Sequence, residues 1–164
     1  MRIAGIITDS IVDGPGVRFV IFGQGCPHHC PACQNPETWD PAGGREMSVK
    51  EIVKILKKRR NYLHGVTFSG GEPFLQAEEM AKLGQEAKKL NLDVVTYTGY
   101  RYEELLALDI PGSRELLEVT DLLVDGPFIE ELKDISLPFR GSTNQRLIDL
   151  AATRKVGVLT LVAS

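Results

Sequence analysis

Short runs rich in β-branched and aromatic residues alternate along this chain with stretches of helical periodicity, and this alternation constrains the fold most strongly. Strands are predicted at residues 18–22, 66–68, 94–97 and 122–124, and the apolar stretches 147–150 and 156–162 suit one or two more. Helices are predicted after a capping box at Ser48, from about 75 to 90, and from 103 to 108. Strands that alternate with helices indicate βαβ units and a mainly parallel sheet with right-handed crossovers.

The length of 164 residues limits how many such units the chain can hold. It corresponds to one domain over residues 1–164, whereas a complete eight-fold barrel takes about 250 residues. We therefore expect an α/β fold of about five strands with flanking helices, either an incomplete (βα) barrel or an open, mainly parallel sheet. In both architectures the functional groups gather at the carboxyl ends of the strands.

Composition excludes several classes of protein. Hydrophobic residues make up 43% of the chain and charged residues 25%, as in an ordinary globular protein. No apolar stretch approaches the ~20 residues of a membrane helix, and no signal segment is recognisable at the N-terminus. The net charge of −3 argues against nucleic acid as a partner. We expect a cytoplasmic protein without a membrane association.

All three cysteines, Cys26, Cys30 and Cys33, lie within eight residues with the spacing C-x3-C-x2-C. An odd number of clustered thiols in a reducing compartment points to metal or redox chemistry rather than to disulfides. Iron–sulfur clusters normally take four thiolates, so three would leave one iron open to another ligand. A Cys3His zinc site that uses His28 or His29 is the alternative, and three buried structural thiols without a metal are a further reading.

A second motif, Gly70-Gly71-Glu72-Pro73, follows the predicted strand at 66–68. Two glycines let a small polar ligand approach the backbone closely, and Glu72 has the charge to pair with a ligand ammonium. The same residues also suit an ordinary turn between a strand and a helix. Asp125 follows another predicted strand, at 122–124, so these motifs are expected to converge on one mouth.

The cysteine spacing together with Gly-Gly-Glu-Pro resembles the radical S-adenosylmethionine superfamily. Residues 13–18 resemble the first motif of activases for glycyl radical enzymes. Residues 34–39 and 139–146 resemble one branch of these, the activators of anaerobic (class III) ribonucleoside-triphosphate reductase. The resemblance runs from residue 2 to about residue 150.

The resemblance implies that the three cysteines ligate a 4Fe-4S cluster whose fourth iron binds the amino and carboxylate groups of S-adenosylmethionine. It implies further cofactor contacts from Gly70, Gly71 and Glu72 to the methionine part, from Ala32 and Gln34 in the adenosyl pocket, and from Asp125. One electron from a donor such as flavodoxin or ferredoxin would release a radical that takes a hydrogen atom from a glycine of the reductase. Ala32 and Gln34 stand where related chains often have aromatic or histidine residues.

Other readings stay open at this point. The chain could act on another glycyl radical enzyme or on a metabolite, as in deazapurine synthesis, and a zinc-binding structural module is a further alternative. Residues 139–146 and 125–128 are expected on the rim of the mouth, where Arg140 and Arg146 could pair with a cofactor carboxylate or with the partner. The basic run Lys57–Arg60 suits either a solvated helix end or the docking of an acidic electron donor.

Overall fold

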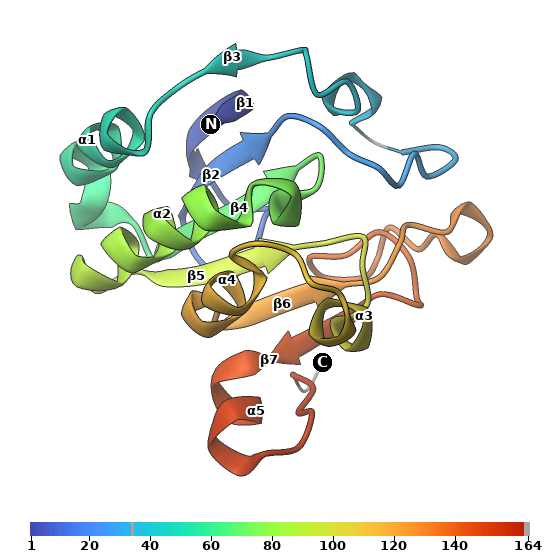
Figure 1. Ribbon diagram of the computed structural model, residues 1–164. Coiled ribbons are helices and arrows are strands. Elements are labelled where there is room, and N and C mark those ends of the chain that lie inside the picture. The colour runs from blue at the N-terminus through green and yellow to red at the C-terminus, as the bar shows by residue number, and fades with distance from the viewer. Residues whose placement is uncertain (34, 163–164) are drawn as a thin grey trace.

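The computed structural model describes residues 1–33 and 35–162, which form a twisted seven-stranded sheet (Figure 1). The order of the strands across the sheet is β3-β1-β2-β4-β5-β6-β7. Their bounds are β1 Arg2–Ser10, β2 Arg18–Gly23, β3 Arg45–Glu46, β4 Gly65–Gly70, β5 Asp93–Tyr97, β6 Leu122–Asp125 and β7 Arg146–Asp149. Strands β2, β4, β5 and β6 pair in parallel, whereas β1, β3 and β7 add antiparallel at the edges.

The helices are α1 Val49–Arg59, α2 Ala77–Lys89, α3 Tyr102–Ala107, α4 Ser113–Val119 and α5 Leu150–Val156. The buried faces of α1, α2 and α4 pack on one side of the sheet, where Phe19, Phe68 and Leu123 form the centre of the core. Figure 1 shows these three helices side by side on that face. A smaller apolar cluster of Val95, Val124 and Leu147 lies on the opposite face, which the helices leave open.

The α/β prediction and the four central strands are confirmed, and the sheet is open rather than a closed barrel. The capping box at Ser48 is also confirmed, because its hydroxyl accepts from the Glu51 amide and the Glu51 side chain accepts from the Ser48 amide. In the described residues, no helix is both long and apolar enough to cross a membrane.

The ends of the chain differ from the prediction. The sheet has seven strands rather than about five, because β1 and the two-residue β3 extend one edge. The expectation of a strand over 156–162 is wrong for most of that stretch: Val156 ends α5, and the chain then returns along β7 through one bridge between Ile148 and Leu161. Helix α4 was not predicted; it begins after Gly112, which has a left-handed φ of +80° and no side chain to cap the helix.

Candidate functional site

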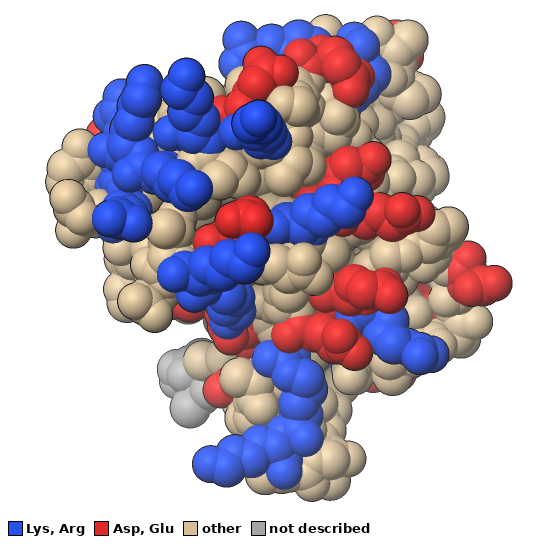
Figure 2. Space-filling model, turned by 60° about the vertical axis from the view of Figure 1, so that its left-hand side comes forward, with Lys and Arg blue, Asp and Glu red and all other residues tan. Residues whose placement is uncertain are grey.

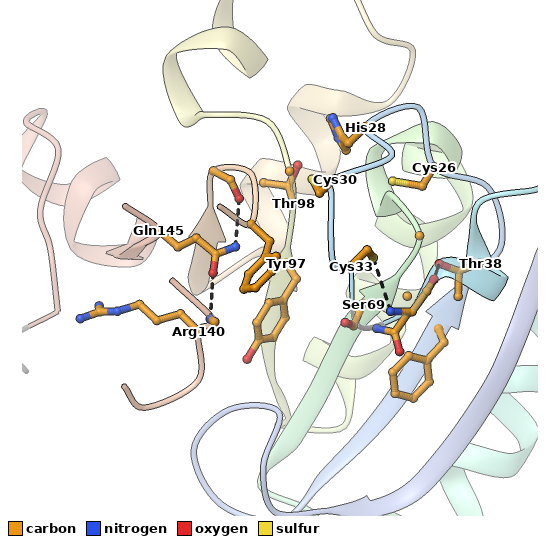
Figure 3. Close-up of a pocket in the computed structure, with 18 of the residues that line it drawn as sticks. Cys26, His28, Cys30, Cys33, Thr38, Ser69, Tyr97, Thr98, Arg140 and Gln145 are labelled. Carbon is orange, nitrogen blue, oxygen red and sulfur yellow. Dashed lines mark hydrogen bonds between the residues drawn. The ribbon is translucent and has the colours of Figure 1, made fainter. Parts of the chain in front are cut away.

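The carboxyl ends of β2, β4, β5 and β6 border one cavity of about 540 Å³, as expected for a mainly parallel sheet. The loop after β2 contributes the cysteines, and the ends of β4 and β5 contribute Ser69 to Gly71 and Tyr97 to Gly99 (Figure 3). The long segment between β6 and β7 closes the other side with Phe128, Leu137, Phe139, Arg140 and Gln145. Four separate strand ends therefore meet at a single pocket.

All three cysteines line this cavity and are partly exposed, with free thiols. Burial raises the pKa of the Cys26 thiol, and the negative charge of Glu72 raises it further, whereas backbone hydrogen bonds from His28 and His29 act in the opposite direction. The Asn35 amide donates to Cys33 Sγ over 3.4 Å (Figure 3). A cationic group in the cavity would offset the cost of ionising these thiols.

The placement of the thiols fits a cluster with several irons. In the described part of the chain, no three His, Cys, Asp or Glu side chains come close enough to bind a single metal ion. The three thiols instead face one cavity from separate positions, and in an iron–sulfur cluster each thiolate binds its own iron. Both histidines considered for zinc are engaged elsewhere: His28 contacts Glu72, and His29 stacks on Trp39.

Gly70 and Gly71 are required where two loops approach each other. Gly70 has a φ of +94°, and a Cβ added to it would lie 2.6 Å from the backbone of Gly23. A Cβ on Gly71 would lie 2.2 Å from the carbonyl oxygen of Gly25. The two loops are joined by hydrogen bonds from the Gly71 amide to Gly23 (2.9 Å) and from the Glu72 amide to Gly25 (2.8 Å). Both glycines also line the cavity, so their backbone is accessible to a ligand.

Glu72 is enclosed behind the cavity wall and is 1% exposed. Its carboxylate accepts hydrogen bonds from His28 Nε2 (2.6 Å), Thr98 Oγ1 (2.9 Å) and the amides of Gly99 (2.8 Å) and Phe74 (3.1 Å). The carboxylate is therefore satisfied within the chain. A contact between Glu72 and a ligand ammonium stays a prediction, and it would require one of these partners to move.

Asp125 is also 1% exposed, and it is paired with Arg146 through Oδ1 (3.0 Å) and Oδ2 (2.5 Å). Arg146 donates in addition to both carboxylate oxygens of Glu103, at 3.0 and 2.8 Å, and these bonds lower the pKa of Glu103 to about 2. Arg146 is thus engaged by carboxylates of this chain, in contrast to the expected pairing with a cofactor or partner. Gly126, the residue after Asp125, reaches the cavity.

Two of the proposed adenosyl contacts lie away from the described cavity wall or outside the described residues. Ala32 is exposed, has a left-handed φ of +58° and is not among the residues that line the cavity. Gln34 lies outside the described residues.

Tyr97 was not predicted from the sequence as a site residue. Its hydroxyl donates to the carbonyl oxygen of Phe139 over 2.6 Å, and burial raises its pKa. Tyr97 follows Val95 by two positions, so strand periodicity places both side chains on the open face of the sheet. This hydrogen bond attaches the segment between β6 and β7 to the sheet beside the cavity.

Arg140 lies on the same segment and borders the cavity, but Figure 3 shows its guanidinium directed away from the cysteines. Its Nε is buried and has no hydrogen-bond partner among the described residues. The basic side chains Lys57, Lys58 and Arg59 lie elsewhere, in the last turn of α1. Figure 2 shows Lys and Arg side chains gathered in the region of α1, in the upper part of that view.

Comparison with known proteins agrees with this geometry. The family described as "4Fe-4S single cluster domain" matches residues 12–148. The anaerobic ribonucleoside-triphosphate reductase-activating protein of Escherichia coli (strain K12) is 36% identical over 142 residues, which cover 82% of this chain and 90% of that protein. The protein of the same name from Enterobacteria phage T4 is 36% identical over 143 residues, or 83% of this chain and 86% of the phage protein.

The pyruvate formate-lyase 1-activating enzyme of Escherichia coli (strain K12) is also 36% identical, over 158 residues that cover 92% of this chain. That match covers 61% of the enzyme, whereas the match to the reductase activator of the same strain covers 90% of its length. The chain therefore belongs to the 4Fe-4S single-cluster family and, within it, to the anaerobic ribonucleoside-triphosphate reductase-activating proteins.

Proposed function

We propose that this chain activates an anaerobic ribonucleoside-triphosphate reductase by generating a glycyl radical on it, with a 4Fe-4S cluster and S-adenosylmethionine as cofactors. The observation that carries the proposal is that three thiols face one cavity beside the glycine backbone of the neighbouring strand end. The relatives that this chain matches over most of their own length are named as activators of that reductase.

Cys26, Cys30 and Cys33 are proposed as the ligands of the cluster, which leaves one iron without a protein thiolate. Gly70 and Gly71 would receive the methionine part, because their backbone lines the cavity next to the cysteine loop. Bound together, the cluster and S-adenosylmethionine supply a one-electron cleavage of the sulfonium that yields methionine and a radical able to take a hydrogen atom from a glycine. Contacts from Ala32, Gln34, Glu72 and Asp125 to the cofactor remain part of the proposal.

The remaining walls of the cavity would keep water from the reacting groups. Tyr97, Phe128, Leu137 and Phe139 supply apolar surface to these walls. So reactive a radical requires a closed site in which it meets only its target. The face of the sheet that the helices leave open gives a glycine-bearing loop of the partner a route to this cavity, and the docked partner would then complete the enclosure.

A one-electron donor such as flavodoxin or ferredoxin is proposed to approach on the side of the cysteine loop. The basic run at Lys57–Arg60 is unsuited to this role, because α1 leads into the amino end of β4. The cysteines follow the carboxyl end of β2, which runs parallel to β4, so they lie at the other end of the sheet. The basic run is better explained by its favourable interaction with the negative end of the α1 dipole.

The match to a pyruvate formate-lyase activator supports one alternative, activation of a different glycyl radical enzyme. The experiment that separates the two is anaerobic incubation of the reduced, cluster-loaded protein with S-adenosylmethionine and either enzyme. A doublet glycyl-radical EPR signal is expected on the reductase and a much weaker one on the lyase. The opposite preference would support the alternative, and turnover of a small molecule with both enzymes radical-free would contradict both proposals.

A further inference from the structure

We propose that His28 is a positioning residue, which fixes the cysteine loop in place through its hydrogen bond to the buried carboxylate of Glu72. The inference rests on the proposed role of the cysteines as cluster ligands. It assigns His28 and Glu72 a shared function, which is to hold Cys26 and Cys30 in the positions that a cluster requires.

The first argument is that the cysteine loop has few other attachments. Between Pro27 and Cys33, the hydrogen bond of His28 is the one that connects the loop to Glu72, in the segment after β4, in the described part of the chain. The adjacent His29 stacks on Trp39 with ring centroids 4.6 Å apart, which holds the loop on its other side. His28 lies midway between Cys26 and Cys30, so its attachment fixes the backbone that carries both thiols.

The second argument is the burial of Glu72. Its carboxylate is fully enclosed, and His28 is the ionisable side chain that pairs with it among the described residues. A buried carboxylate is costly unless its oxygens are hydrogen-bonded and its charge is offset. Thr98 and the amides of Gly99 and Phe74 satisfy the remaining acceptor positions. Glu72 therefore joins the ends of three strands, with the loop after β2 attached through His28.

The third argument is that the surroundings are shaped for the imidazole ring. The ring of Tyr100 meets that of His28 edge to face, with centroids 4.5 Å apart and planes at 78°. A Cβ added to Gly99 would lie 2.4 Å from the His28 ring, so only glycine leaves room for it. The ring is thus seated between β5 and the cysteine loop rather than extending into solvent.

In this arrangement, the glycines and the glutamate of the Gly-Gly-Glu-Pro loop have different roles. The backbone of Gly70 and Gly71 faces the cavity and is available to a ligand, whereas the Glu72 carboxylate faces the cysteine loop behind the wall. Loss of either His28 or Glu72 should then have the same consequence: the cysteine loop no longer holds the thiols in the positions that a cluster requires. Loss of both should add little to the loss of one.

The test is a double-mutant cycle with His28→Leu, Glu72→Gln and the double variant, measured by denaturant unfolding of the iron-free protein under reducing conditions. We expect the two positions to be coupled at least about tenfold in the unfolding equilibrium, or about 1.4 kcal/mol. Additive effects would overturn the proposal. His64→Gln is the matched control, because His64 is 57% exposed and pairs with Asp93 at the far end of the sheet.

A second measurement uses the cluster-loaded protein. It records the rate at which a chelator removes iron and the EPR spectrum of the reduced cluster. His28→Leu should lose iron at least about tenfold faster than the wild type, because the thiols are no longer held in the positions that the cluster requires. For the same reason, the EPR spectrum of the variant should be broader. His28→Gln should restore both, since its amide can donate to Glu72 from a similar position. Iron retention equal to the wild type in His28→Leu would overturn the proposal. A wild type that takes up no cluster would instead contradict the proposed function, and the coupling in the iron-free protein would then decide the role of His28.

Discussion

Cys26, Cys30 and Cys33 are the only thiols of the chain, so every sulfur ligand that it can offer to a cluster comes from one loop. The structure directs all three into the same cavity without joining them in a disulfide. Iron–sulfur clusters usually have four cysteine ligands, and a site with three leaves one iron for an exogenous molecule. If one of these thiols is lost, no other thiol in the chain can take its place.

Replacement of any one cysteine by alanine is expected to abolish the cubic cluster, because two thiolates cannot hold it in a cavity this open. The measurement is iron and sulfide content with the absorption spectrum after anaerobic reconstitution. Circular dichroism of the iron-free variants provides the control, since the partly exposed thiols contribute little to the core. Stoichiometric zinc without iron–sulfur absorption in the wild type, or an intact cluster in a variant, would contradict the assignment.

At the scale of the elements, the sequence predicts the four parallel strands because their buried cores are short, continuous β-branched and aromatic runs. It does not predict β1, whose nine residues bury only Ile3 and Ser10 and pair with β2 through two irregularities. The cysteines and the two glycines could be identified because their spacing is local. The contact of His28 with Glu72 and that of Tyr97 with Phe139 join residues far apart in the chain, so no local pattern shows them.

The ion pair between Glu103 on α3 and Arg146 on β7 should make the free energy of unfolding depend on pH. Hydrogen bonds from Arg146 lower the pKa of Glu103 from 4.5 to about 2. A lowered pKa means that this ion pair stabilises the fold above about pH 4.5, and that its contribution is lost as the pH falls toward 2. Because Glu103 is 54% exposed, the contribution is limited to about 0.2–1 kcal/mol.

Glu103→Gln should therefore be less stable than the wild type at pH 7, and the difference should shrink as the pH is lowered below about 4. Urea unfolding of the iron-free variant and wild type between pH 7 and low pH measures the difference in the free energy of unfolding and its change with pH. Glu118→Gln, which alters an exposed carboxylate on α4, should show neither effect. A difference between Glu103→Gln and the wild type that stays constant with pH would show that Arg146 does not stabilise the ionised form of Glu103.

At the scale of the whole molecule, helices α1, α2 and α4 cover one face of the sheet (Figure 1). The cavity is lined by Tyr97, which packs against the apolar cluster of the other face. The segment between β6 and β7 forms the outer wall of the cavity, and hydrogen bonds from the Tyr97 hydroxyl to Phe139 and from the Gly126 amide to Tyr100 (2.9 Å) hold it there. An open sheet with its site on the uncovered face can admit a loop from a large protein. A closed barrel of eight units would leave much less room.

We predict that Arg140, which lies on this wall, contacts the reductase rather than the cluster. Its guanidinium points away from the cysteines, and its buried Nε has no hydrogen-bond partner among the described residues. We therefore expect Arg140→Ala to leave iron content and S-adenosylmethionine binding unchanged while the glycyl-radical yield falls about three- to tenfold at low reductase concentration. Because a charge at the rim of an interface acts mainly through association, excess reductase should restore the yield, and the salt dependence of activation should weaken. Arg114→Ala, on the helical face, is the control. A loss of cluster or cofactor binding in Arg140→Ala would place this residue in the cofactor site and not at the surface that meets the partner.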